Sequence, residues 1–172
     1  MIETVHFAGT RLRRVAAVFG LSLVCAAGAI WAGIVLFTTY GLSPADGGVL
    51  APLASRIAWA GFVSLSGLGF AGGMFVYCGC YVVRIGYDDS SREYLVSTLT
   101  RPGSVKIRIR PDDVESAREH RGRIETGKLS VDAPWLGLKI RGRKLPLIVD
   151  LRGSIVSETR FQELTGYRRL SI

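Results

Sequence analysis

Residues 15–37 have the sequence VAAVFGLSLVCAAGAIWAGIVLF, and residues 57–83 have the sequence IAWAGFVSLSGLGFAGGMFVYCGCYVV. Neither stretch contains an Asp, Glu, Lys, Arg or His side chain, and the uncharged run that begins at Val15 continues to Ala45. Roughly 20 helical residues cross a bilayer core about 30 Å thick. Both stretches are long enough for that, so we predict two transmembrane helices rather than two buried helices of a soluble protein.

The charged residues are distributed unevenly around these stretches. The chain has 22 Lys and Arg against 14 Asp and Glu, which gives a net charge of +8. Residues 1–14 carry a net charge of +2 and residues 84–172 a net charge of +6, whereas Asp46 and Arg56 cancel between the spans. Because Lys and Arg beside span ends mark the cytoplasmic or matrix face, we predict that both termini lie on one side of the membrane. No recognition-helix pattern supports a nucleic-acid partner.

The start of the chain also has features of a secretory signal, because a basic segment precedes an apolar run. Residues 15–37 exceed a typical signal h-region, however, and no convincing cleavage site precedes the second span. We therefore interpret the first apolar run as a retained helix that can also serve as an internal targeting signal.

The chain divides into five predicted parts. Residues 1–14 form a basic N-terminal arm. The first span (15–37) and the second span (52–83) are joined by a turn-rich loop (38–51). Residues 84–172 form a β-rich domain on the same side as the arm. Pro52 suits the start of the second span because its missing N–H would be unpaired there anyway. The predicted fold class is membrane α+β, a two-helix transmembrane hairpin followed by a small, mainly antiparallel β domain with a short C-terminal helix.

After the second span the sequence takes on the period of β-strands. Residues 105–110 alternate between apolar and cationic side chains, and residues 136–140 alternate in the same way. Residues 141–144 read as a tight turn into a partner strand over residues 145–151, in which Pro146 marks an edge or a bulge. These patterns predict a β-hairpin near the end of the chain.

Further elements are marked less sharply. Strands are expected over residues 94–100, 112–119 and 128–131. Residues 82–87 either prolong the second span or begin the first strand. Near the end, Ser157 can cap a short helix that begins with Glu158 and stops before Gly166.

Small residues recur at four-residue spacing in both spans. In lipid, close approach of backbones through small side chains drives the packing of helices. The helix-packing interface that we predict contains Gly28, Ala32, Gly61, Gly69 and Gly73, and Ala29 and Gly33 show the same spacing. These faces either join the two spans to each other or receive a helix of another protein, and the sequence leaves both alternatives open.

The spans offer little chemistry. His6 and His120 are the only histidines and lie outside the spans, which contain no ionisable side chain for a proton or ion path. Cys78 and Cys80 invite a Cu(I) interpretation, but residues two apart on a helix point about 200° away from each other. The tail lacks a phosphate-binding loop, a zinc-spaced Cys/His set and a nucleophile motif. We therefore predict no enzyme, no cofactor and no metal site.

Cations gather in the predicted strands of the tail. The candidate contacts are Arg84, Lys106, Arg108, Arg110, Lys139, Arg141, Arg143 and Lys144. If these faces meet near the membrane, they are expected to bind anionic head groups such as cardiolipin or an acidic partner subunit. A face that is simply hydrated is the alternative.

The segment Trp135-Leu136-Gly137-Leu138-Lys139-Ile140-Arg141-Gly142-Arg143, followed by Val149-Asp150 and Gly153, resembles a family of mitochondrial transmembrane proteins. The closing Phe161…Gly166-Tyr167-Arg168 and the order of the parts are similar as well. The segment resembles the family of transmembrane protein 223, which has transmembrane proteins 70 and 186 as more distant relatives. The resemblance implies residence in the mitochondrial inner membrane with a matrix-facing tail, and no catalytic residues carry over from it.

Family members help to build respiratory-chain complexes, and the resemblance links the chain to cytochrome c oxidase first and to complex I second. The first hypothesis is therefore a non-catalytic structural subunit or assembly protein of such a complex, with its subunits and cardiolipin as partners. The second is a membrane-anchored lipid- or ligand-binding β module unrelated to respiration.

Overall fold

The structure is a computed structural model of the chain and describes residues 2–9, 11–42, 48–99, 107–120, 122–126 and 129–167. The chain divides into two compact units. The helical unit comprises Val15–Tyr77, and the β unit comprises Met1–Arg14 together with Cys78–Ile172. Lys106, Arg168 and most of the predicted loop tip between the spans lie outside the described residues.

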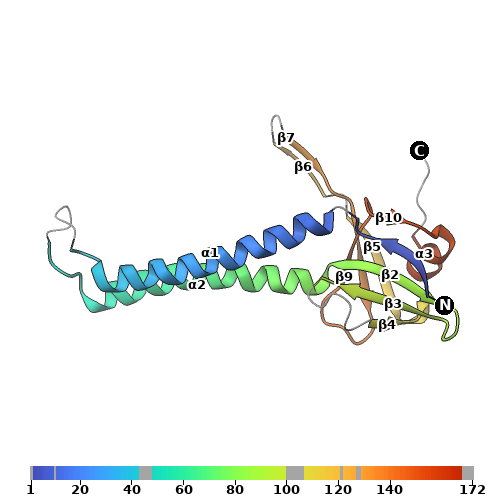
Figure 1. Cartoon of the computed structure of the whole chain (residues 1–172), viewed down its shortest axis with the longest axis horizontal. Coiled ribbons are helices and arrows are strands. Elements are labelled where there is room, and N and C mark those ends of the chain that lie inside the picture. The colour runs from blue at the N-terminus through green and yellow to red at the C-terminus, as the bar shows by residue number, and fades with distance from the viewer. Residues whose placement is uncertain are drawn as a thin grey trace. The chain divides into compact units, whose positions relative to one another are not determined.

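The helical unit is a pair of antiparallel helices, α1 (Arg11–Thr39) and α2 (Leu53–Cys80) (Figure 1). A helix satisfies all its backbone hydrogen bonds internally, which an apolar segment needs in lipid. Only 17% of the most apolar window of α1 and 6% of that of α2 are buried. The core helix of a soluble protein would be mostly buried, so the low burial agrees with two helices that are long and apolar enough to cross a membrane.

The connection between the helices is fastened by Arg56 and Gly41. Arg56 Nε donates to the carbonyl oxygen of Phe37 at 2.7 Å, and its guanidinium lies 4.8 Å from the centroid of the Phe37 ring. Because carbonyl groups at a helix C-terminus carry partial negative charge, this contact stabilises the end of α1. Gly41 has a φ of +95°, and a Cβ there would lie 2.5 Å from the carbonyl oxygen of Val49, so the turn requires glycine.

The β unit is built from two main antiparallel sheets. The first has the order β10-β1-β2-β3-β4, with β1 (Ile2–Phe7), β2 (Val82–Asp88), β3 (Glu93–Thr98), β4 (Ile107–Ile109) and β10 (Ser154–Ile155). The second has the order β5-β8-β9, with β5 (Val114–His120), β8 (Trp135–Ile140) and β9 (Leu147–Asp150). A separate two-stranded hairpin is formed by β6 (Arg123–Thr126) and β7 (Leu129–Asp132).

One apolar core holds the two main sheets together. Alternate residues of each strand point inward, as the period of two requires, and α3 (Glu158–Thr165) adds Phe161 and Leu164. A single parallel bridge between Tyr81 and Ile148 links the sheets directly. Burial of each large apolar side chain contributes about 1.5–3 kcal/mol. The largest fully buried apolar residues include Val5, Ile85, Tyr94, Ile109, Leu136, Leu138, Leu147 and Val149.

Polar contacts of Tyr94 attach α3 to the first sheet. The Tyr94 hydroxyl lies 2.9 Å from Oε2 of Glu163 and 3.0 Å from the carbonyl oxygen of Arg160. Arg160 lies over the Tyr87 ring, 4.0 Å from its centroid. Burial, followed by the hydrogen bond to Glu163, raises the pKa of Tyr94 well above its ordinary value. The hydroxyl therefore stays protonated and holds the helix in place.

The C-terminal end of α3 has the predicted glycine, whereas its N-terminal end lacks a side-chain hydrogen bond from Ser157. Gly166 ends the helix with a φ of +64°, and its N–H donates to the carbonyl oxygen of Gln162 at 2.7 Å, as expected of a C-terminal glycine. The side chain of Ser157 makes no capping hydrogen bond, and only its carbonyl oxygen accepts, from the N–H of Phe161 at 3.0 Å. Ser157 therefore occupies the predicted N-cap position but caps the helix without its side chain.

Two boundaries near the spans differ from the sequence prediction. The predicted basic arm contains β1, which pairs with β2 and β10 and is an inner strand of the sheet. The second helix ends at Cys80 rather than at Val83, because the following residues form β2 and exchange backbone hydrogen bonds with β1 and β3. The antiparallel sheets and the short terminal helix agree with the predicted fold class.

Candidate functional site

The contact between α1 and α2 is made by small residues on one face of each helix. Ser22, Ala26 and Gly33 are the buried residues of α1. A Cβ added to Gly33 would lie 2.2 Å from Oγ of Ser64, and one added to Gly67 would lie 2.4 Å from Cβ of Ala29. Both distances are far below ordinary van der Waals contact. The helices therefore pack backbone against backbone at Gly33 and Gly67.

The residues predicted for helix packing lie outside this contact. A Cβ added to Gly28, Gly61, Gly69 or Gly73 meets no atom within 4 Å in the part of the chain that the structure describes, and Ala32 is half-buried. Gly69 lies two residues beyond Gly67, which is about 200° around the helix. At these four glycines the two described spans leave room for a side chain, whereas at Gly33 and Gly67 they do not. Contact of the four glycines with a helix of another protein stays a prediction.

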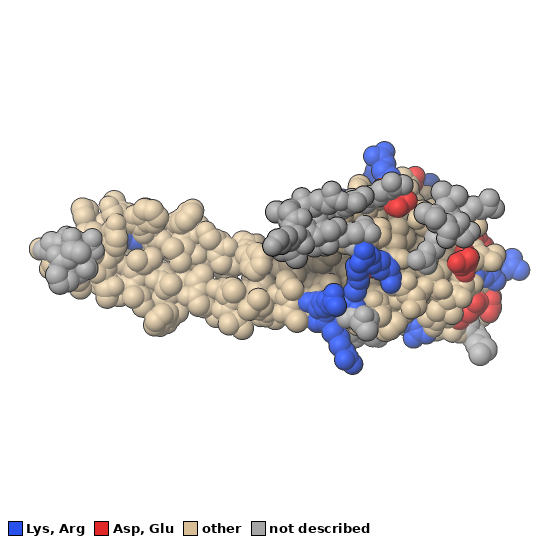
Figure 2. Space-filling model, turned by 90° about the horizontal axis from the view of Figure 1, so that it is seen from above, with Lys and Arg blue, Asp and Glu red and all other residues tan. Residues whose placement is uncertain are grey.

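The remaining surface of the helical unit is apolar. Trp31, Val24, Leu65 and Phe62 are each between 65% and 68% exposed. Figure 2 shows that the charged atoms on the face in view gather on the β unit, whereas the helical unit is almost entirely free of them. Apolar surface of this extent suits lipid or other membrane helices rather than water.

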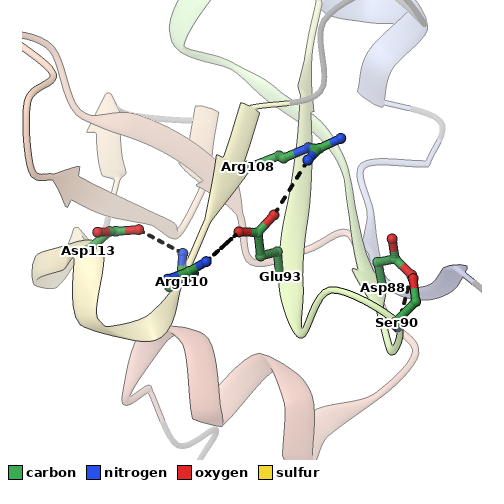
Figure 3. Close-up of polar contacts among 6 residues, drawn as sticks. All are labelled: Asp88, Ser90, Glu93, Arg108, Arg110 and Asp113. Atoms are coloured by element: carbon green, nitrogen blue, oxygen red, sulfur yellow. Dashed lines mark hydrogen bonds and ion pairs between the residues drawn. The ribbon is translucent and has the colours of Figure 1, made fainter.

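Glu93 on β3 pairs with two cations of the neighbouring segment, Arg108 in β4 and Arg110 just after it, and offsets part of their charge. The Glu93 carboxylate lies 3.0 Å from Nη2 of Arg110 and 3.9 Å from Nη1 of Arg108, so that it sits between the two (Figure 3). The backbone N–H of Arg110 also donates to Oδ2 of Asp113 at 2.9 Å. Exposed pairs of this kind add little stability, but they reduce the positive charge available to a ligand.

The cations of the β8–β9 hairpin fall into two groups. Nζ of Lys139 lies 2.9 Å from Oε2 of Glu115, and Lys139 first, then the more distant Arg141, lowers the pKa of Glu115. Arg143 and Lys144, by contrast, form no ion pair with any residue among the described ranges. The structure thus divides the predicted cationic set into paired and unpaired members. Arg84, on β2, is exposed and donates to the hydroxyl of Thr4.

A buried polar centre surrounds His6, which is fully buried. Nε2 of His6 lies 3.0 Å from the carbonyl oxygen of Asp150. The Asp150 carboxylate is held by Nη1 of Arg11 at 3.2 Å and by the backbone N–H of Arg152 at 2.9 Å. A Cβ at Gly153 would lie 2.6 Å from Nε2 of His6, so only glycine fits there. The centre therefore ties β1 and the start of α1 to β9 and the turn that follows it.

The protonation of His6 follows from these contacts. A carbonyl oxygen only accepts, so Nε2 carries the hydrogen and the neutral ring leaves Nδ1 as an acceptor. Nδ1 is buried and has no hydrogen-bond partner among the residues that the structure describes. Burial, the largest cause, lowers the pKa of His6 against the opposing effect of Asp150. The ring is neutral and enclosed, so this centre fastens the fold rather than meeting a substrate.

Sequence reasoning missed this centre. It treated His6 only as a histidine outside the spans, and it assigned Asp150 and Gly153 to a shared hairpin and turn. His6 and Asp150 are 144 residues apart, and no local pattern links them. The one sequence feature that pointed to this centre was the spacing of Asp150 and Gly153, three residues apart at the end of a predicted strand.

The three thiols do not form a recognisable metal centre. Cys25 is exposed, and Cys78 and Cys80 are buried near the end of α2. No three His, Cys, Asp or Glu side chains gather as ligands within the described residues.

These features define a membrane protein with two long apolar helices, a β unit built from both ends of the chain, and cations concentrated on that unit. The sequence matches the model of the TMEM70/TMEM186/TMEM223 protein family over residues 4–167. The chain therefore belongs to this family, which is not one of enzymes. No curated protein and no solved structure matches the chain.

Proposed function

We propose that the protein is a non-catalytic accessory subunit or assembly protein of a mitochondrial respiratory-chain complex, with cytochrome c oxidase favoured and complex I next. Family membership carries this proposal, because the family is consistent with a general role in assembling mitochondrial complexes. The choice among complexes rests on the resemblance of the hairpin from Trp135 to Asp150 to transmembrane protein 223.

The helical unit supports a role in docking. Gly69 and Gly73 lie one turn apart on α2 and are open, while Gly67 is engaged with α1. A face of small residues that the chain does not use for its own packing can admit a second helix at close range. The absence of ionisable side chains from both uncharged runs leaves packing as the main capacity of these helices.

The sheet supports the proposed location in the mitochondrial inner membrane with both termini in the matrix. The strand before α1 pairs with the strand after α2, with Ile2 opposite Asp88 and Phe7 opposite Arg84. If both helices cross the bilayer, these strands must lie on the same side. Arg13 and Arg14 are exposed at the start of α1, and the positive-inside rule favours the cytoplasmic or matrix face for such cations, so in the inner membrane we expect this side to be the matrix.

Native-gel electrophoresis of mitochondria that express the tagged chain tests the proposal. We expect the chain to migrate with mature cytochrome c oxidase if it is a subunit, or with a smaller intermediate if it is an assembly protein. Cells without the chain should then contain less of the complete enzyme. Migration away from every respiratory complex, together with normal amounts of each complex in those cells, would contradict the proposal.

A double variant separates docking from folding. Gly69→Leu with Gly73→Leu fills the open face and should release the chain from the complex without unfolding it, because neither position touches α1. Phe70→Leu with Phe75→Leu is the matched control, since it changes two exposed residues of α2 without filling the glycine face. Unchanged incorporation of the glycine double variant would remove these glycines from the docking surface.

A further inference from the structure

We infer that the β8–β9 turn contacts anionic phospholipid at the membrane surface through Arg143, Lys144 and the neighbouring Leu145. The inference goes beyond the proposed function, because a lipid contact at this turn does not depend on which respiratory complex the protein serves.

The strand register brings the turn to the end of the second helix. Ile148 pairs in parallel with Tyr81, which follows directly after Cys80, the last residue of α2. Because the bridge is parallel, the chain preceding Ile148 runs back in the same direction as the chain preceding Tyr81. The turn over residues 141–146 therefore lies on the side of Tyr81 from which the chain arrives, that is, the side of Cys80. This is where a membrane-crossing α2 leaves the bilayer.

The charges of this turn are available to a ligand. The nearest carboxylate on the facing strand, Glu115, lies 2.9 Å from Lys139 and is engaged by it. The backbone N–H of Arg141 donates to the carbonyl oxygen of Asp113 at 2.8 Å, which fixes the backbone at the start of the turn. Arg143 and Lys144 lie further around the turn, past Gly142 at a φ of +80°. Neither is paired with a carboxylate in the described chain, so both keep their charge for an anion.

An apolar side chain accompanies these two cations. Leu145 is 48% exposed and follows Lys144 directly. A leucine next to Arg and Lys is typical of a segment that lies in the interface, where the apolar group enters the acyl boundary and the cations meet phosphate groups. Binding of a soluble acidic protein would use the two cations but would not explain why a leucine beside them is exposed. The combination therefore favours a lipid surface.

Other exposed cations belong to the same unit. Arg13 and Arg14 are exposed in the first turn of α1, where that helix would enter the membrane. The paired cations Arg108 and Arg110 provide a built-in comparison on the same unit.

The test is a titration of the full chain, purified in an uncharged detergent, with cardiolipin that carries a fluorescent acyl chain. Each Lys or Arg near an anionic surface strengthens binding about fivefold. Arg143→Ala with Lys144→Ala should therefore raise the Kd roughly thirtyfold. Arg108→Ala with Arg110→Ala changes the net charge equally but should raise the Kd much less, because Glu93 pairs with both guanidinium groups and offsets part of their charge. Circular dichroism checks that both variants are folded.

The outcomes separate lipid from other anions. Phosphatidylcholine with the same fluorophore should not bind, and Arg143→Lys should retain cardiolipin binding. Equal losses in the two double variants would overturn the inference, because the effect would then be one of net charge. Displacement of cardiolipin by inorganic phosphate or by a poly-glutamate peptide at similar concentrations would also overturn it, since the turn would then recognise a free phosphate or an acidic protein.

Discussion

Replacement of Gly67 by alanine tests the contact that holds the helical unit together. The new Cβ would lie 2.4 Å from Cβ of Ala29 and 3.3 Å from Cα of Ala26, and the second neighbour is backbone that cannot rotate away. Carbon atoms prefer separations of about 3.5–4.0 Å, so the helices must separate by roughly 1 Å. Overpacking of this kind costs about 1–3 kcal/mol.

Gly69→Ala is the matched control for this change. It is the same substitution two residues away in the same helix, and its Cβ meets no atom within 4 Å in the described part of the chain. Alanine favours a helix over glycine by up to about 1 kcal/mol, and both variants receive that gain. The free energies of unfolding of the two variants should therefore differ by about 1–3 kcal/mol.

Titration of the detergent-solubilised protein with sodium dodecyl sulfate measures this difference. Trp31 on α1 and Trp59 on α2 report the separation of the helices by fluorescence, and far-UV circular dichroism follows the loss of helix. Gly67→Ala should unfold at a lower fraction of the denaturing detergent than Gly69→Ala. If the two variants unfold at the same fraction of denaturing detergent, the helices do not pack at Gly67. The distinction between a packed face at Gly67 and an open face at Gly69 and Gly73 would then be refuted.

Three further predictions concern the β unit. The free energy of unfolding should fall as the pH drops below about 6.5, because the unfolded chain then protonates His6 while burial keeps the folded ring neutral; the loss is up to about 1.4 kcal/mol per pH unit until the folded pKa is reached. In denaturant titrations at several pH values, the His120→Gln control should keep this dependence of unfolding free energy on pH, and His6→Phe should lose it. An equal dependence in both variants would contradict a buried neutral His6. Gly153→Ala should lower the free energy of unfolding by about 1–3 kcal/mol, since its Cβ would lie 2.8 Å from the carbonyl oxygen of Phe7. Ser154→Ala, at an exposed position, is the control in thermal unfolding. Equal melting temperatures of the two variants would refute the close contact. Tyr94→Phe should cost about 1–2 kcal/mol and make α3 more sensitive to limited proteolysis, because the hydrogen bond to Glu163 is lost. A cleavage rate equal to that of the unsubstituted chain would show that the hydroxyl does not hold the helix.

Local sequence patterns were sufficient for the elements whose partners are close in the chain. The uncharged runs predicted two helices because each helix bonds its own backbone. The alternation over residues 136–140 predicted β8, and its partner β9 begins seven residues after β8 ends, at Leu147. Gly166 marked the end of α3 because a left-handed residue there is a local requirement.

The missing parts depend on contacts between distant residues. The segment that forms β1 looked like a basic arm because its partner β2 begins at Val82, beyond both spans. Small residues at helical spacing occur on several faces, and the sequence alone could not show that Gly33 and Gly67 make the contact while Gly28 and Gly69 remain open. The pairing of Arg108 and Arg110 with Glu93 likewise needs the register of two strands.

The strand order imposes a sequence of events on the formation of this protein. β1 lies between β10 and β2, so the first sheet uses chain from before α1, from after α2 and from the region next to α3. Such a sheet cannot close until both helices have been made, and it cannot close at all if the flanking strands lie on opposite sides of a bilayer. His6 then joins Asp150 only when β1 and β9 are both in place. Closure of the β unit thus comes after the synthesis of α1 and α2, because β1 must wait for β2 and His6 must wait for Asp150.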